Sequence, residues 1–313
     1  MGKRHSHKKG SVGFRPRKRA VNQMPRVGFW PKAADKRLLG FAGYKAGMTT
    51  ISYVDDSTSP NAGNEIYGAA TVIEAPPMTV YGIRGLKAGQ VVADEITSDE
   101  KILKTLGTKS KKKNSLSADK ISEVFVLAFT SPDQCGFGKK SPEKMMIGVG
   151  GKDVAEKLDY AKSLLGKTVK ASEVFKSGEF TDIISVTVGK GWQGSVKRFG
   201  TATQRRKATG KVRHIGTLGA WHPGYVQYTV PMPGQMGYHK RTEINKRVMK
   251  ITAPEEVNCK GGFKHYGILK NECLLVLGSV GGPVKRLIRL RKAARKDVIK
   301  PPELRSISLE SKQ

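Results

Sequence analysis

Acidic residues are absent from two long parts of this 313-residue sequence. None precedes Asp35, and none lies between Asp182 and Glu243. Over the whole chain 57 Lys and Arg stand against 26 Asp and Glu, a formal net charge of +31. An acid-free segment cannot supply the paired carboxylates that general acid–base catalysis uses, so neither part can hold such a site by itself.

Cysteines are few and long apolar runs are missing. Cys135, Cys259 and Cys273 are far apart in sequence, and none belongs to a C-x-x-C pair, which argues against a zinc ribbon or a disulfide scaffold. We expect reduced thiols in a cytosolic protein. No apolar run approaches the ~20 residues that span a bilayer. The basic start at residues 1–5 has no apolar region behind it and does not predict a signal peptide.

The positive charge is confined to particular segments. Residues 38–188 hold 19 basic and 18 acidic side chains, whereas residues 1–37 hold 12 and one, residues 189–250 hold 13 and one, and residues 251–313 hold 13 and six. A near-neutral half therefore carries strongly basic flanking segments. Such a distribution predicts a polyanionic partner, because Lys and Arg bind polyphosphate backbones with release of counterions.

Hydrophobic patterning predicts a chain of mainly β structure between irregular basic tracts. Residues 1–37 show no periodicity and predict an extended arm, and residues 189–243 are too long for an ordinary loop. The pattern at 153–165 predicts a helix that Gly166 ends. Residues 284–291 alternate apolar and basic side chains, as in a half-buried strand with a cationic outer face. Further strands are predicted at 39–44, 48–54, 69–75, 78–83, 124–129, 183–188, 266–269 and 273–277.

Several short motifs fit a catalytic or cofactor site poorly. Residues 189–194 read G-x-G-x-x-G, but a dinucleotide site needs an acid about 20 residues later, and Trp192 would crowd the phosphate turn. Residues 166–168 resemble the end of a Walker A loop, but its first glycine would be Ala161, inside the predicted helix. The six histidines do not pair into metal-ligand spacing. We therefore expect no enzyme and no metal site.

A membrane-surface protein is the alternative from another class. Gly2 with Ser6 fits the myristoylation pattern, and the basic arm would add a polybasic anchor. A lipid anchor would not account for the second basic tract at 189–243.

Trp221, His222 and Pro223 form the most specific local feature. The tryptophan is predicted to lie in mid-loop among cations. It could pack back onto the folded part, or it could be an aromatic wedge among nucleotides, since aromatic rings stack on unpaired bases. No recognition-helix unit is evident, so RNA fits better than duplex DNA.

Five segments carry a resemblance to a known family. They are LGFAGYKAGMT at 39–49, VIEAPPM at 72–78, GAWHP at 219–223, GYHKRTEINK at 237–246 and GGFKHYG at 261–267. These segments resemble the large-subunit ribosomal protein L-three family of the archaeal and eukaryotic type, and the similarity covers nearly the entire chain. Long extensions typical of eukaryotic members are lacking, which favours an archaeal origin.

The resemblance implies a mainly β fold with an α+β insertion: a translation-protein-type antiparallel β-barrel with long irregular extensions that penetrate rRNA. The implied parts are a basic N-terminal extension at 1–37, a barrel core at 38–93, 178–188 and 244–300, an inserted α/β subdomain at 94–177, a basic central extension at 189–243, and a C-terminal tail at 301–313.

The resemblance also implies a function. The protein would be a non-enzymatic, structural constituent of the large ribosomal subunit in the cytoplasm, bind large-subunit rRNA and support early subunit assembly. Its central loop would approach the peptidyl transferase centre with Trp221, His222 and Pro223 at the tip. Neighbouring ribosomal proteins L-thirteen, L-fourteen and L-twenty-four-e are the implied protein partners. No membrane, small-molecule substrate or cofactor is expected, and Mg²⁺ only through the rRNA.

The residues expected to bind rRNA come from both basic tracts. The modified histidine of eukaryotic relatives is replaced here by Thr209, so no role of that modification carries over. The expected residues are Lys3, Arg4, Lys8, Lys9, Arg15, Arg17, Lys18, Arg19, Lys190, Lys197, Arg198, Arg205, Arg206, Lys207, Lys211, Arg213, Trp221, His222, His239, Lys240, Arg241, Lys246 and Arg247.

Overall fold

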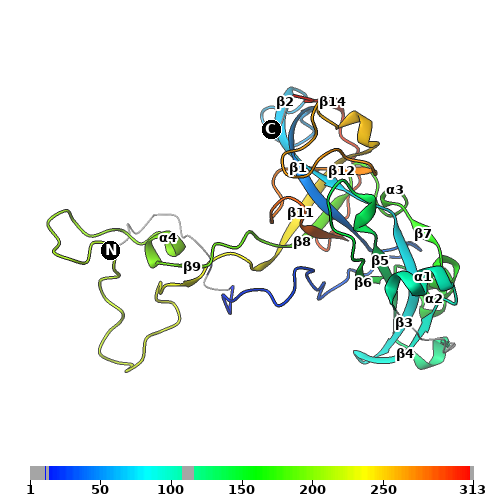
Figure 1. The fold of residues 1–313 in the computed structure, drawn as a ribbon, viewed down its shortest axis with the longest axis horizontal. Helices are drawn as coiled ribbons and strands as arrows, with labels where there is room; N and C mark the ends of the chain where they lie inside the picture. The colour runs from blue at the N-terminus through cyan, green and yellow to red at the C-terminus, as the bar shows by residue number, and fades with distance from the viewer. Residues whose placement is uncertain (1–10, 12–13, 108–115, 311–313) are drawn as a thin grey trace. The chain divides into compact units, whose positions relative to one another are not determined.

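A computed structural model describes residues 11, 14–107 and 116–310 of the chain (Figure 1). The chain divides into two compact units. We call the first unit the extension; it comprises the described residues up to Asn22 together with Val186–Arg241. The second unit, the body, comprises the described residues of Gln23–Ser185 and those from Thr242 onward. Each unit has its own physical character.

The larger sheet of the body is antiparallel and has seven strands among the described residues. Their order is β13-β8-β11-β12-β2-β1-β14, and β1 also pairs with β13, through Gly40 opposite Arg291 and Tyr44 opposite Leu287. Prediction placed two separate strands at 39–44 and 48–54, whereas the structure has one continuous strand there. The bounds are β1 Gly40–Val54, β2 Glu65–Glu74, β8 Phe180–Val186, β11 Lys240–Thr252, β12 Cys273–Leu277, β13 Leu287–Lys292 and β14 Leu304–Ile307.

The second sheet of the body is also antiparallel and contains β3 Met78–Lys87, β4 Gln90–Ile96, β5 Glu123–Thr130, β6 Glu143–Gly148 and the short β7 Thr168–Val169. Residues 78–93 were predicted to belong with the barrel strands; in the structure β3 pairs with β4 on one side and β5 on the other, in this second sheet. Most β3 side chains are buried, which suits a strand with a neighbour on each edge.

Helices are short in the described part of the chain. Asp99 caps α1 by accepting the amide hydrogen of Lys101 at 3.0 Å, and Gly107 ends it with a φ of 61°. The predicted helix at 153–165 is confirmed as α2. The α-helices are α1 Glu100–Leu106, α2 Val154–Leu164, α3 Ala171–Val174 and α4 Ser195–Phe199, and the 3-10 helices are η1 Ala118–Lys120, η2 Pro132–Gln134 and η3 Pro254–Glu256.

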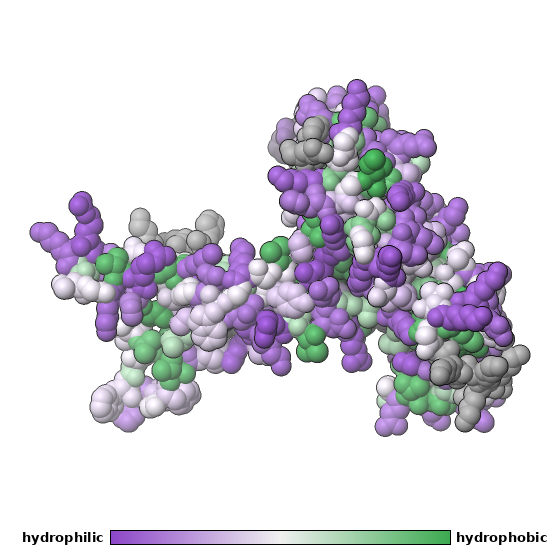
Figure 2. Space-filling view, viewed as in Figure 1, coloured by the Kyte–Doolittle hydropathy of each residue, from purple (hydrophilic) through white to green (hydrophobic). Residues whose placement is uncertain are grey.

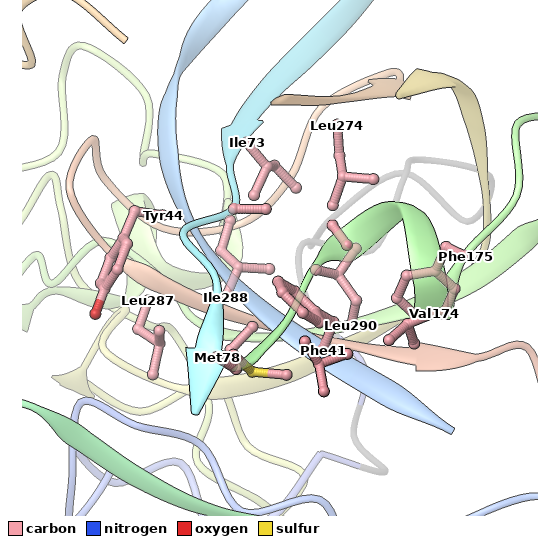
Figure 3. Close-up of a cluster of buried hydrophobic side chains, with 14 of the residues drawn as sticks. Phe41, Tyr44, Ile73, Met78, Val174, Phe175, Leu274, Leu287, Ile288 and Leu290 are labelled. Atoms are coloured by element: carbon pink, nitrogen blue, oxygen red, sulfur yellow. The ribbon is translucent and has the colours of Figure 1, made fainter. Parts of the chain in front are cut away.

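Both sheets of the body share one hydrophobic core. Figure 3 shows Phe41, Ile73 and Leu290 of the larger sheet close to Met78 of β3 and to Phe175 beside α3. All five side chains are buried. Since burial of such side chains stabilises by about 1.5–3 kcal/mol each, the two sheets support each other.

The predicted N-terminal arm is divided between the two units. Residues 23–37 belong to the body. There Val27 is buried, and Trp30 packs so closely on Gly40 that a Cβ at that glycine would lie 2.6 Å from the indole. Charge and a lack of periodicity predicted one arm, but Val27 and Trp30 supply enough apolar surface to fasten its second half.

The predicted cationic outer face of residues 284–291 is wrong for strand β13, because its arginines are buried. Arg289 and Arg291 are 5% and 8% exposed. Arg291 donates to Asp182 at 2.5 Å and to the carbonyl of Phe29 at 2.6 Å, and Arg289 donates to the carbonyl of Met146 at 2.5 Å. Burial lowers the pKa of Arg289 to about 10. A strand was correctly predicted there and is observed at Leu287–Lys292, but all of its residues are buried. The sequence pattern did not show that a chain segment and an aspartate cover its basic side chains.

Two further segments differ from expectation. The predicted strand at 266–269 is a turn closed by an isolated bridge between Phe263 and Gly267, and the Tyr266 hydroxyl donates to the buried Glu74 at 2.5 Å. The C-terminal segment, expected as a tail, contributes β14, which pairs with β1 at Ile51–Tyr53. Both segments therefore help to complete the body.

Candidate nucleic-acid interface

The extension begins as a two-stranded antiparallel ribbon. Strand β9 Trp192–Gln193 pairs with β10 Gly234–Gln235. Below this pairing the Lys190 amide donates to the Met236 carbonyl at 2.9 Å. Gly237 has a φ of 72°, and a Cβ there would lie 2.0 Å from the Val188 carbonyl oxygen. Only glycine fits this position, so the ribbon backbone is closely specified.

Helix α4 is fastened to the ribbon by an arginine. Arg198 donates from Nε to the Gln235 carbonyl at 3.2 Å and from Nη1 to the Met232 carbonyl at 2.7 Å. Burial, and to a smaller degree the charge of Arg17, lower the pKa of Arg198. The Arg198 guanidinium thus holds α4 to the ribbon. Because its partners are neutral carbonyl groups, its positive charge is not cancelled.

Residues 14–20 of the N-terminal segment lie against the central segment through arginine–ring contacts. Arg15 stacks over Tyr228 at 3.7 Å, Arg17 over Phe199 at 4.8 Å and Arg241 over Phe14 at 4.6 Å from guanidinium carbon to ring centroid. Exposed cation–π pairs contribute about 0.5–1 kcal/mol each. Burial, then the charge of Arg17, lower the pKa of Arg241.

Two contacts to backbone carbonyl oxygens support the same association. The His239 ring Nδ1 is 3.0 Å from the Lys18 carbonyl oxygen, and the Ala20 amide donates to the Tyr238 carbonyl at 2.8 Å. The structure therefore brings both predicted basic tracts together within one unit: Arg15, Arg17 and Lys18 beside Arg241 and His239.

Beyond the ribbon the chain forms loops without a core. Residues 200–233 contain no helix or strand (Figure 1). None of residues 202–229 is buried, and Trp221 is 88% exposed. Within the extension, the Trp221 indole therefore has no core to pack into. His222, Pro223 and five cations of the loops are exposed as well: Arg205, Arg206, Lys207, Lys211 and Arg213.

The extension has no internal counter-charge. Residues 186–241 contain ten Lys and Arg and no Asp or Glu. Figure 2 shows hydrophobic residues interspersed with hydrophilic ones on this unit. The basic side chains of residues 186–241 have no carboxylate partner within the segment, so this surface suits a polyanion.

The remaining predicted binding residues lie in different places. Lys18, Arg19, Lys190, Lys197 and Lys240 are exposed in the extension. Lys3, Arg4, Lys8 and Lys9 lie outside the described residues.

Two predicted residues belong to the body instead. Lys246 pairs with Glu243 at 3.1 Å. Arg247 is 9% exposed and makes two 2.7 Å hydrogen bonds to the carboxylate of Asp56. The guanidinium of Arg247 is occupied within the chain, and we leave it out of the candidate interface.

Sequence reasoning missed the aromatic members of this surface. Phe14, Phe199 and Tyr228 hold arginines, and Trp192 and Tyr225 are 75% and 71% exposed. Aromatic residues spaced among Lys and Arg in an acid-free segment were the available signal.

Other chemistries find little support in the described part of the chain. There, no group of three or more His, Cys, Asp or Glu side chains is placed to hold a metal ion. No helix within the described residues is long and apolar enough to cross a membrane. The three cysteines are free and buried, and burial raises the pKa of Cys135 and Cys273, which makes them poor nucleophiles.

Known proteins similar to this sequence belong to one family. The family model described as ribosomal protein L3 matches residues 1–117 and 101–310. The large ribosomal subunit protein uL3 of Methanocaldococcus jannaschii is 44% identical over 98% of this chain and 97% of its own length. The uL3 proteins of Methanothermobacter thermautotrophicus and Methanosphaera stadtmanae are each 44% identical over 100% of this chain and 99% of their own length. These methanogen relatives are consistent with the expected archaeal type.

Proposed function

This chain belongs to the ribosomal protein L3 family, and we propose that it binds large-subunit rRNA through its extension. As a family member it is a structural constituent of the large ribosomal subunit. Its relatives are named as ribosomal proteins, which agrees with the expectation of a non-enzymatic role. The observation that carries the proposal is the acid-free segment 186–241, which has ten basic residues, five of them in exposed loops without a core.

The proposed mechanism is positional. The body would be a closed barrel of the translation-protein type, supported by a strand order that returns from β1 to β13. The loop cations Arg205, Arg206 and Lys207 would neutralise phosphates so that RNA segments can approach one another. Such a role early in subunit assembly needs no chemistry by the protein itself, and Mg²⁺ would enter only with the rRNA.

We also propose that the exposed tip at Trp221, His222 and Pro223 lies near the peptidyl transferase centre. An indole that is 88% exposed offers a face for stacking on an unpaired base. The cytoplasmic large subunit is the proposed location. Contacts with the neighbouring proteins L-thirteen, L-fourteen and L-twenty-four-e belong to the same proposal.

The test is the salt dependence of binding to a large-subunit rRNA transcript. Replacing Arg205, Arg206, Lys207, Lys211 and Arg213 by Gln should reduce the slope of log affinity against log salt by about 0.7–0.9 for each phosphate that the variant no longer neutralises. A matched control replaces five exposed lysines of the body by Gln, namely Lys87, Lys101, Lys104, Lys120 and Lys162.

Equal slopes for the two quintuple variants would contradict the proposal. Sedimentation with ribosomal particles gives a second criterion against the membrane-surface alternative. Loss of sedimentation on RNase treatment supports rRNA binding, and loss on detergent supports a lipid anchor.

A further inference from the structure

The G-x-G-x-x-G segment at 189–194 has no assigned role, although it holds one of the most exposed aromatic side chains. Trp192 is 75% exposed, compared with 88% for Trp221. No ring contact or cation–π contact to another described residue covers its indole. Single exposed aromatic side chains are common on protein surfaces, so the backbone and the charges around Trp192 decide whether it suits a partner.

The backbone that carries Trp192 is held firmly. Trp192 pairs with Gln235 across the ribbon, and the Met236 amide donates to the Gly191 carbonyl at 2.9 Å. The Gln193 side chain donates to the Lys190 carbonyl at 2.5 Å. Trp221, by contrast, lies in loops without regular structure. Trp192 therefore offers a pre-organised aromatic face, whose ordering costs little on binding.

The charges around Trp192 indicate the partner. Lys190 is two residues before it, Lys197 is five residues after it, and both are exposed. No acid lies between Asp182 and Glu243. An aromatic face among cations matches an unpaired nucleotide, whose base stacks on the ring while its phosphates meet the lysines.

We propose that Trp192 is a second base-stacking site of the extension, separate in sequence from the Trp221 tip, and that Lys190 and Lys197 hold the flanking phosphates. The partner is an unpaired nucleotide of the rRNA, so this inference rests on the proposed function. In this reading the glycines of the 189–194 segment serve the local backbone rather than a dinucleotide: Gly191 has a φ of 65°, and Gly194 directly precedes α4.

Tryptophan emission of the full-length protein provides the first test. The probes are a single-stranded 12-nucleotide oligouridine and an RNA duplex of the same length. Trp221→Phe leaves Trp30 and Trp192, and the double variant Trp221→Phe with Trp192→Phe leaves Trp30 alone. Their difference spectrum reports Trp192. Quenching of that emission by the single strand, and weaker quenching by the duplex, is the expected result.

Affinity provides the second test. Trp192→Ala should weaken single-strand binding about fivefold or more, with an unchanged salt slope, whereas Lys190→Gln should reduce the slope by about 0.7. Trp192→Phe should retain binding better than Trp192→Leu, because only Phe keeps an aromatic face. Tyr67→Ala is the matched control, since Tyr67 is 76% exposed in the body and its loss should change nothing. Thermal unfolding of each variant checks that it folds.

The outcomes separate the two proposals. Strong, salt-dependent RNA binding without quenching of Trp192, or equal affinities of the Ala and wild-type proteins, overturns the stacking site and leaves the proposed function standing. Equal retention by Leu and Phe also overturns it, in favour of an apolar protein contact. Failure of the wild-type protein to bind both these probes and the large-subunit rRNA transcript overturns the proposed function itself.

Discussion

The body and the extension use arginine in opposite ways. In the body, two arginines are paired with buried carboxylates: Arg37, which is half-buried, with Glu179 at 2.7 Å and the buried Arg291 with Asp182 at 2.5 Å. In the extension, Arg15 and Arg17 lie over aromatic rings. A ring face attracts a guanidinium without cancelling its charge, whereas a carboxylate cancels it. The extension therefore keeps a positive surface while it still gains structure.

The same contrast holds for aromatic residues. Trp30 packs against the core of the body, whereas Trp192 and Trp221 are exposed in the extension. One residue type is structural in one unit and available for binding in the other. Composition alone does not separate these uses; the presence of a core beside the residue does.

The largest effect is expected from deletions on either side of the division between extension and body, which follows Asn22. Deleting residues 1–37 removes Trp30, the partner of Glu179 and the Phe29 carbonyl that Arg291 uses. We expect a loss of unfolding free energy on the order of 5 kcal/mol or more, comparable to the whole stability of many domains. Deleting residues 1–22 should leave the unfolding midpoint of the body nearly unchanged and flatten the salt dependence of rRNA binding.

Urea unfolding followed by circular dichroism measures both deletions. The two truncated proteins differ only in residues 23–37, so each serves as the control of the other. Equal stabilities would mean that those residues are not part of the body.

A smaller but sharper effect is expected at Asp182. Its carboxylate is fully buried and accepts hydrogen bonds from Arg291, from the Asn245 amide at 3.1 Å and from the Ala294 amide at 3.2 Å. Asp182→Ala leaves a buried guanidinium without a counter-charge and should cost about 3–5 kcal/mol in urea unfolding.

The matched control is an exposed ion pair of the body. Lys250 and Glu256 lie 2.5 Å apart with side chains 40% and 48% exposed. Glu256→Ala should change the unfolding free energy by less than about 1 kcal/mol. If both substitutions cost the same, burial does not decide the value of these pairs.

Arg291 also shows how much of the fold could be predicted from the sequence. The alternation at 284–291 correctly predicted a strand, and the mainly β character followed from similar runs. The predicted basic face was wrong because its cover comes from Phe29 and Asp182, more than 100 residues away in sequence. Long-range partners leave no trace in local periodicity.

The candidate interface remains a prediction, and it rests on local composition more than the body does. The absence of acids predicted a basic segment at 189–243, and in the structure Val186–Arg241 form one compact unit with the N-terminal segment. An exposed surface depends on local composition, and no distant residue needs to cover it. The aromatic partners Phe199 and Tyr228 were missed because their contacts again involve a segment remote in sequence.

The smallest changes in unfolding free energy are expected for alanine substitutions of two tryptophans, one in each unit. Trp30→Ala removes a half-buried indole that packs on Gly40 and Gly148, and should lower the unfolding free energy by about 2 kcal/mol. Trp221→Ala removes an indole that is 88% exposed and should change it by less than about 0.5 kcal/mol, while subunit function is impaired. Urea midpoints of the two full-length variants, measured beside wild type, make the comparison. A Trp221 variant as unstable as the Trp30 variant would show that the loop tip packs on a core in solution, and the division of roles between the two units would then fail at its most exposed residue.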